Sequence, residues 1–204
     1  MFYKFARPLM FLFMLIFFPK KVYGKENLLK DTKQVIVCNH FGKIDILFVG
    51  SLFKGKTYFL AKRELFAKKF GAKVIRSLGG IPVQRDSVDL DCIREGLKVL
   101  KSGERLAIFP EGRRNLVDNE LQELKAGAAM FAFKAKAPIV PIIIEKKARP
   151  FRRANLLVGK PISFEEYYSS PYNSELNEIL NEKVKQALLE TQADLRALLA
   201  EKRK

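Results

Sequence analysis

Five short apolar segments, separated by polar and helix-like stretches, constrain the fold of this chain more than any other feature. They occupy residues 35–38, 57–61, 81–83, 105–109 and 139–144. Apolar runs of this length are typical of buried strands, whereas residues 44–53 and 89–101 between them favour helices. Strands that alternate with helices predict an α/β fold. We therefore expect a single domain with a mixed, largely parallel central sheet flanked by helices, for which 204 residues are sufficient.

Weaker patterns predict the remaining elements. Residues 22–24 and 155–158 are candidates for two further strands, the first at an edge of the sheet. A small-residue helix is expected over 126–137, and a long amphipathic helix from Ser174 onward. Pro141 interrupts the 139–144 run, and because proline has no backbone N–H we expect it at an edge or a bulge.

The first of the five segments leads into the only histidine of the chain. His40 lies five residues before Asp45, and positions five apart are roughly 140° apart around a helix. The two side chains therefore meet only if the chain turns between them, which Gly42 allows. Asp45 would then orient the imidazole and leave its other nitrogen as a general base near neutral pH. For the pair alone, a hydrogen-bonded turn histidine without a catalytic role is the alternative.

Two other segments also deliver polar residues to a turn. Arg85 follows residues 81–83, where a guanidinium suits a phosphate group at the carboxyl edge of a sheet. Glu111 and Gly112 follow residues 105–109, with glycine permitting a close backbone approach. The alternatives are a surface ion pair for Arg85, and for Glu111 an ion pair with the arginines that follow it.

The formal net charge of +16 requires an anionic partner: a phosphate-bearing substrate, an acidic membrane surface or nucleic acid. Residues 2–18 are rich in phenylalanine and bounded by lysine and arginine. Their uninterrupted apolar part, 8–18, would reach about 16 Å as a helix, roughly half of a hydrocarbon core. No small-residue cleavage site follows, so the segment does not match a secretory signal peptide. We expect residues 1–19 to form an interfacial membrane helix and 20–204 the main domain; the alternative is a buried N-terminal core helix.

The two cysteines, Cys38 and Cys92, are too few for a disulfide framework and lie in or beside apolar runs, as reduced core residues do. No zinc-binding spacing is present, so no metal is expected. Cys38 shares a strand face with His40, which leaves a thiol nucleophile as an alternative. The chain has no Gly-x-Ser-x-Gly nucleophile turn.

Four blocks in order carry a family resemblance. They are Asn39-His40-x4-Asp45, Gly80-Ile81-x-Val83-x-Arg85, Phe109-Pro110-Glu111-Gly112 and Val140-Pro141. Together they resemble the blocks of the glycerolipid acyltransferases, in particular the bacterial 1-acyl-glycerol-3-phosphate acyltransferases, over roughly residues 20–165. The resemblance implies that His40 is the catalytic base and Asp45 its orienting carboxylate. It implies acceptor binding by Arg85, Glu111 and Gly112, with Lys62 and Arg113 as further candidate substrate contacts.

The resemblance also implies the reaction. A fatty acyl group would pass from an acyl thioester, carried by acyl carrier protein or coenzyme A, to the sn-2 hydroxyl of lysophosphatidic acid, giving phosphatidic acid for phospholipid biosynthesis. The thioester is a co-substrate, and no other cofactor is expected. Without a serine nucleophile, direct transfer is favoured over a covalent acyl-enzyme. The enzyme would be peripheral or monotopic at the cytoplasmic face of the cell membrane, in contact with an anionic membrane surface.

Two departures from the family pattern leave the acceptor open. Gly42 stands where many members have serine or threonine, and Arg113 stands where threonine is common. Another lysophospholipid or lipid acceptor is therefore an alternative. Two further alternatives for the function are a thioester hydrolase, in which His40 activates water, and a basic binding module without catalytic chemistry. No nucleic-acid-binding signature accompanies the basic residues, so nucleic acid is not an expected partner.

Overall fold

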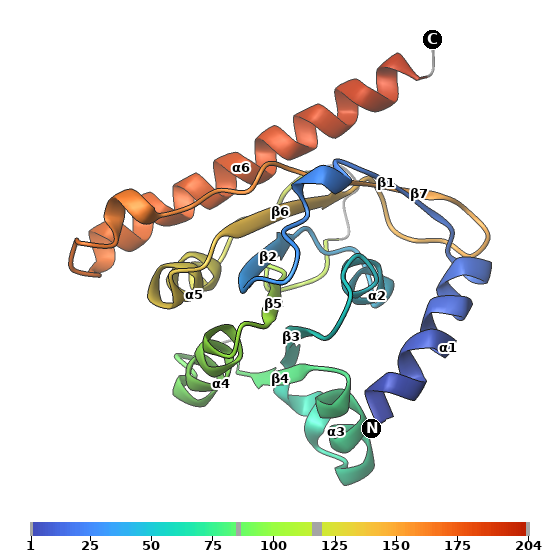
Figure 1. Cartoon of the computed structure of the whole chain (residues 1–204), viewed down its shortest axis with the longest axis horizontal. Helices are drawn as coiled ribbons and strands as arrows, with labels where there is room; N and C mark the ends of the chain where they lie inside the picture. Colours follow the sequence, from blue (N-terminus) through green and yellow to red (C-terminus); the bar gives the residue numbers. More distant parts are fainter. Residues whose placement is uncertain (1, 85–86, 116–119, 203–204) are drawn as a thin grey trace.

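A mixed sheet with helices on both faces forms the centre of the molecule in the computed structural model, which describes residues 2–84, 87–115 and 120–202 (Figure 1). Its strands run in the order β1-β7-β6-β2-β5-β3-β4. Neighbouring strands pair in parallel except for the antiparallel pair of β6 and β7. The strands are β1 (Lys20–Tyr23), β2 (Gln34–Cys38), β3 (Thr57–Lys62), β4 (Gly80–Val83), β5 (Arg105–Ile108), β6 (Ile139–Ile144) and β7 (Ala154–Val158). The predicted α/β fold with a largely parallel sheet is confirmed.

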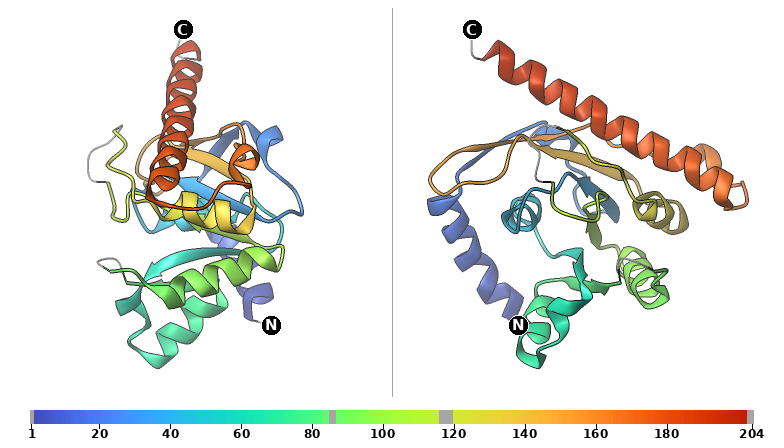
Figure 2. Two further views of the ribbon diagram at one scale, coloured as in Figure 1. Left: turned by 90° about the vertical axis from the view of Figure 1, so that its left-hand side faces the viewer. Right: turned by 180° about the vertical axis from the view of Figure 1, so that it is seen from behind.

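The helices divide between the two faces of the sheet, as Figure 2 shows from behind. On one face α4, α5 and α6 cover a core that includes Leu106 and Ile143. On the other face α2 and part of α1 cover a second core around Ile36 and Phe48. The helices are α1 (Phe2–Phe17), α2 (Ile44–Gly50), α3 (Lys69–Ser77), α4 (Leu90–Lys101), α5 (Gly127–Ala135) and α6 (Ser174–Glu201). Short 3-10 turns occupy η1 (Lys25–Asn27), η2 (Arg63–Phe66) and η3 (Glu165–Tyr167).

The local sequence accounts for the burial of two central strands and for the starts of two helices. All residues of β2 and β6 are buried, as the largely apolar character of residues 35–38 and 139–144 predicts. The residues before α4 and α6, Asp89 and Asn173, accept hydrogen bonds from the first-turn amides of Cys92 and Leu176. In contrast, β3 was expected to be buried, yet its middle residues are only half-buried. For Phe59 the reason is the pocket that it lines.

The expected edge position of Pro141 is wrong, because β6 is an internal strand between β2 and β7. On the β2 side Pro141 is in register with Val37. On the other side the pairing is irregular: Ile139 bridges to Ile162, whereas Ile142 pairs with Val158. Three steps along β6 therefore oppose four steps along the partner segment, which matches the bulge alternative. An internal strand accommodates proline here because the regular ladder to β7 starts one residue later.

Helix α1 packs on the domain through one stripe only. Met14 is 4% exposed and belongs to the core around Phe48, and Arg7 donates from Nη2 to the Phe53 carbonyl at 3.0 Å. Most of the other apolar residues of α1 are exposed: Leu9, Phe11, Leu12, Phe13, Leu15 and Ile16. The alternative of a buried core helix therefore holds only for the stripe that carries Met14. In the part of the chain that the structure describes, no helix has the length and apolar character needed to cross a membrane.

Candidate active site

The turn that carries His40 is fastened to the carboxyl edge of the sheet. It follows β2, and the side chain of the preceding Asn39 bonds twice to the backbone of Ile144 at the end of β6. Asn39 Nδ2 donates to the Ile144 carbonyl at 2.9 Å, and the Ile144 amide donates to Asn39 Oδ1 at 2.8 Å. This reciprocal pair fixes where the chain leaves β2, so the position of the turn depends on the neighbouring strand.

Within the turn, Asp45 gathers three groups around one oxygen. Asp45 lies in the first turn of α2 and is 0% exposed. Its Oδ2 accepts hydrogen bonds from the amides of Phe41 at 2.6 Å and Gly42 at 2.7 Å, and it lies 2.9 Å from His40 Nδ1. The predicted meeting of the two side chains across the glycine turn is confirmed, whereas their catalytic role stays a prediction.

The imidazole of His40 is held in one orientation but is not sealed off. A carboxylate at Nδ1 favours the tautomer with its proton there, which leaves the lone pair of Nε2 free. The ring stacks on Phe109, with 4.3 Å between ring centroids, and the side chain is 13% exposed. A polar group that enters from this open side would meet a nitrogen that can accept a proton.

Glu111 holds the backbone of the turn. Its Oε1 accepts from the His40 amide at 2.8 Å and its Oε2 from the Gln122 amide at 3.4 Å, and the residue is 3% exposed. Burial raises the pKa of Glu111, partly offset by the hydrogen bond from His40. Among the described residues Glu111 forms no ion pair, so that alternative fails; Arg113 instead donates to Gln122 Oε1 at 3.0 Å. Acceptor binding by Glu111 stays a prediction.

Asn115 and Gln122 were missed by the sequence analysis. The Asn115 amide donates to the His40 carbonyl at 2.6 Å, so the backbone of His40 is bound from both sides. The buried Asn115 side chain accepts from Gln122 Nε2 at 3.2 Å and donates to the Glu120 carbonyl. No motif marks either residue; the only signal is an amide side chain in a polar segment after a strand.

The other predicted substrate-binding residues differ in how near they lie to this cluster. Gly112 has φ +65° and donates to the Phe109 carbonyl at 3.0 Å, so the turn requires a residue that tolerates the left-handed region. Lys62 ends β3, two strands from β2, and pairs with Glu64 at 2.8 Å. Arg113 is exposed, and Arg85 lies outside the described residues. The structure thus brings together His40, Asp45 and Glu111, and it leaves Lys62 at a distance along the sheet.

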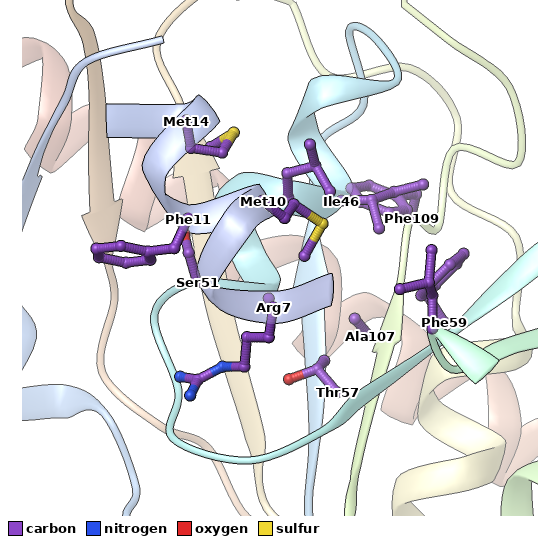
Figure 3. Close-up of a pocket in the computed structure, with 13 residues that line it drawn as sticks. Arg7, Met10, Phe11, Met14, Ile46, Ser51, Thr57, Phe59, Ala107 and Phe109 are labelled. Atoms are coloured by element: carbon purple, nitrogen blue, oxygen red, sulfur yellow. The ribbon is translucent and has the colours of Figure 1, made fainter. Parts of the chain in front are cut away.

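An apolar pocket of about 70 Å³ adjoins the histidine (Figure 3). Met10 and Met14 from α1, Ile46 from α2 and Phe59 from β3 line it. Its wall also includes Phe109, the residue that stacks on the His40 ring. The candidate base therefore lies next to a lining made almost entirely of carbon, which suits a hydrocarbon chain rather than a polar ligand.

Cys38 does not fit the role of a nucleophile. The thiol is buried, and its Sγ lies 3.7 Å from Asn39 Oδ1. Burial raises the pKa of Cys38 well above its usual value, reinforced by the charges of Asp45 and Glu111. Because the thiolate is the reactive form, this environment suppresses reactivity. Over the described ranges, no three histidine, cysteine or carboxylate side chains gather where they could hold a metal ion.

Comparison with known proteins identifies the family. The Acyltransferase family model matches residues 20–145. A 1-acyl-sn-glycerol-3-phosphate acyltransferase of Bacillus subtilis is 32% identical over 175 residues, which cover 81% of this chain and 86% of that protein. The chain belongs to the Acyltransferase family. The resemblance of the four blocks is thereby confirmed.

Other relatives of this acyltransferase-family chain agree. A chloroplastic 1-acyl-sn-glycerol-3-phosphate acyltransferase of Brassica napus is 33% identical over 132 residues, which cover 63% of this chain but only 38% of that protein. The crystal structure of the 1-acyl-sn-glycerophosphate (LPA) acyltransferase, PlsC, of Thermotoga maritima matches with a TM-score of 0.60 and 27% identity. This match covers 92% of the chain and 75% of the PlsC chain. The fold and the family therefore rest on independent comparisons.

Proposed function

We propose that this chain transfers a fatty acyl group from an acyl thioester to the sn-2 hydroxyl of lysophosphatidic acid, giving phosphatidic acid. The hydrogen bond between His40 Nδ1 and the buried Asp45, beside the apolar pocket, carries the proposal. The names of the Bacillus and Thermotoga relatives support the acceptor. The donor is an acyl thioester of acyl carrier protein or coenzyme A.

In the proposed mechanism His40 acts as the general base. Its Nε2 accepts the proton of the acceptor hydroxyl as the oxygen attacks the thioester carbonyl, and Asp45 stabilises the imidazolium that forms. Collapse of the tetrahedral intermediate breaks the carbon–sulfur bond, and the imidazolium proton passes to the departing thiolate. His40 thereby returns to its neutral form. An ester and a free thiol are the products, so neither a metal nor a covalent acyl-enzyme is needed.

Substrate contacts divide into an apolar part and a charged part. The pocket lined by Met14, Phe59 and Phe109 is the proposed place for an acyl chain, because burying methylene groups there contributes roughly 0.8 kcal/mol each. Arg85 and Arg113 are the proposed partners of the acceptor phosphate, through charge-assisted hydrogen bonds. Lys62, Glu111 and Gly112 remain proposed contributors to acceptor binding.

The proposal includes attachment to one leaflet at the cytoplasmic face of the cell membrane. The exposed apolar residues of α1 support it, since so many exposed leucine and phenylalanine side chains would otherwise promote aggregation. A lipid acceptor presents its headgroup at the interface while its acyl chain stays in the bilayer. A domain docked by α1 can therefore meet the hydroxyl there.

A donor-by-acceptor assay with the purified protein tests the function. Thiol release from a long-chain acyl thioester is expected only when lysophosphatidic acid is present, with phosphatidic acid as product. Thiol release without any lipid acceptor would show a hydrolase instead. Preference for lysophosphatidylcholine over lysophosphatidic acid would show a different acceptor, the alternative that Gly42 and Arg113 leave open.

A further inference from the structure

The segment between β6 and β7, residues 145–153, forms a basic loop around a hollow. Five of its nine residues are cations: Lys146, Lys147, Arg149, Arg152 and Arg153. Together with Ala154 they line a volume of about 160 Å³, well above the roughly 10–15 Å³ that one water requires. The lining contains no acidic residue, so an anion that entered would meet cations without a competing carboxylate.

The one acid of the loop, Glu145, pairs with only one of these cations. Glu145 accepts from Asn155 Nδ2 at 2.7 Å and lies 3.8 Å from Lys146 Nζ. Among the residues that the structure describes, Lys147 and the three arginines of the loop form no ion pair. Like charges held this close repel one another, so a bound anion would stabilise the loop.

An aromatic residue ties the basic loop to α1. The Phe151 amide donates to the Phe17 carbonyl at 2.7 Å, and the two rings have centroids 5.3 Å apart. Phe151 has φ +58° and is 69% exposed. A bulky side chain in the left-handed region is uncommon and energetically unfavourable. The fold therefore holds a largely exposed aromatic ring beside the end of α1. Figure 2 shows the loop next to that end of the helix.

The basic loop also lies at the edge of the sheet that carries the candidate active site. It leaves β6 at Ile144, the residue whose backbone is bonded to Asn39 beside His40. The loop returns to β7 at Ala154, whose amide donates to the Pro19 carbonyl at 3.0 Å, just after α1. Any surface that contacts both α1 and the basic loop is therefore also close to the edge that carries His40.

We propose that the basic loop binds the phosphate groups of anionic lipids and forms, with Phe151 at the interface, a second membrane contact beside α1. This inference rests on the proposed attachment of α1 to a membrane. One interfacial helix leaves the domain free to rotate about the helix axis, whereas a second contact fixes that rotation and the distance of the His40 turn from the headgroups. The exposed ring next to the apolar face of α1 favours a lipid surface over a soluble phosphate-bearing partner, which would have no use for it.

Vesicle partitioning tests the charged part of the proposal. The variant Arg149→Gln with Arg152→Gln is compared with Lys98→Gln combined with Lys101→Gln, which removes two exposed cations from α4 on the opposite face. With vesicles that contain phosphatidylglycerol, the loop variant should bind about thirtyfold more weakly than wild type, as expected for two cations near an anionic surface. With pure phosphatidylcholine vesicles its binding should match wild type, and the α4 variant should match wild type with both.

Phe151→Asn tests the aromatic part. Asparagine adopts the left-handed region readily, so this variant should fold. It should bind both kinds of vesicle several-fold more weakly, because the ring contributes apolar contact rather than charge.

The outcomes separate this inference from the attachment of α1. Two results together would overturn the basic loop as a lipid contact and leave α1 as the membrane contact. The loop variant would bind anionic vesicles as wild type does, and a variant with Leu12→Ser and Leu15→Ser would lose binding. Failure of the wild-type protein to bind any vesicle would overturn both. A raised KM for the acyl thioester with unchanged vesicle binding would assign the loop to a soluble donor and overturn the lipid contact.

Discussion

Two regions border the same edge of the sheet: the His40 turn, and the surface made by α1 with the basic loop. They differ in whether their polar, charged and apolar groups have partners within the chain. In the turn, Asp45 and Glu111 are buried and bind backbone amides, and His40 is bound through its ring, its amide and its carbonyl. On the surface, apolar side chains of α1 face outward and four cations of the loop have no ion pair among the described residues. In the first region most polar groups bind partners within the chain, although the buried Asp45 Oδ1 has no hydrogen-bond partner among the described residues. The second region has the composition of a contact surface whose partner lies outside the chain.

The largest effect on activity is expected from His40, the proposed general base of the turn. His40→Ala should lower the turnover number for acyl transfer by 10²–10⁴-fold, the usual contribution of a general base. Steady-state kinetics on a variant whose thermal unfolding matches wild type gives the measurement. The control is Cys38→Ser, which should stay active. Turnover within a few-fold of wild type for His40→Ala would remove the base from the mechanism.

A pair of substitutions on α1 sharpens the contrast between its two faces. Met14→Ala should lower the free energy of unfolding by about 2–3 kcal/mol, because Met14 packs in the core around Phe48. Leu12→Ala, on the exposed face, should change it by less than about 0.5 kcal/mol and instead weaken vesicle binding. Urea unfolding and vesicle partitioning measure the two effects. Equal losses of stability would mean that protein covers the outer face of α1.

Substitution of Glu111 tests whether it serves the turn or the acceptor. In Glu111→Gln the single carbonyl oxygen can still accept from His40, but the amide nitrogen cannot accept from Gln122. A role in the turn alone predicts a decrease in kcat of about tenfold, the size of one lost hydrogen bond, with KM for the acceptor unchanged. The kinetic constants decide between the roles. A raised KM with unchanged kcat would instead support acceptor binding.

The last expected effect concerns Lys20 of β1 and depends on pH. Its Nζ donates to the Phe48 carbonyl at 3.2 Å and to Ser51 Oγ, so β1 is attached to the end of α2. Burial, with a smaller contribution from the charge of Lys25, lowers the pKa of Lys20 from 10.5 to about 8. Between these values the unfolded chain binds more protons than the folded one, so the contribution of Lys20 to stability rises as pH increases.

Unfolding of wild type and Lys20→Met at several pH values measures this contribution. Relative to the variant, wild type should gain roughly 3 kcal/mol as the pH rises from about 8 to 10.5. The exposed neighbour Lys21 provides the control through Lys21→Met. A difference between wild type and Lys20→Met that stays constant with pH would contradict the lowered pKa.

The sequence by itself determined the strands, the α/β class and the meeting of His40 with Asp45. Each of these depends on short-range information: an apolar run long enough to be buried, and a five-residue separation with Gly42 between. The four blocks also indicated the family, because their residues and their order can be read directly along the chain. Exposure of most of α1 agrees with the expectation of an interfacial helix, although the sequence did not reveal which stripe would pack on the domain.

Only the tertiary structure decided how distant segments complete the turn. Glu111 reaches the amide of His40 across 71 positions of the chain, and Asn115 reaches its carbonyl. Pro141 lies in an internal strand rather than an edge strand, because the order of strands places β7 beside β6. Strand order follows from how all the apolar faces pack at once, so no local pattern encodes it. The same packing placed Phe151 against α1, which joined the basic loop to the helix that precedes the sheet.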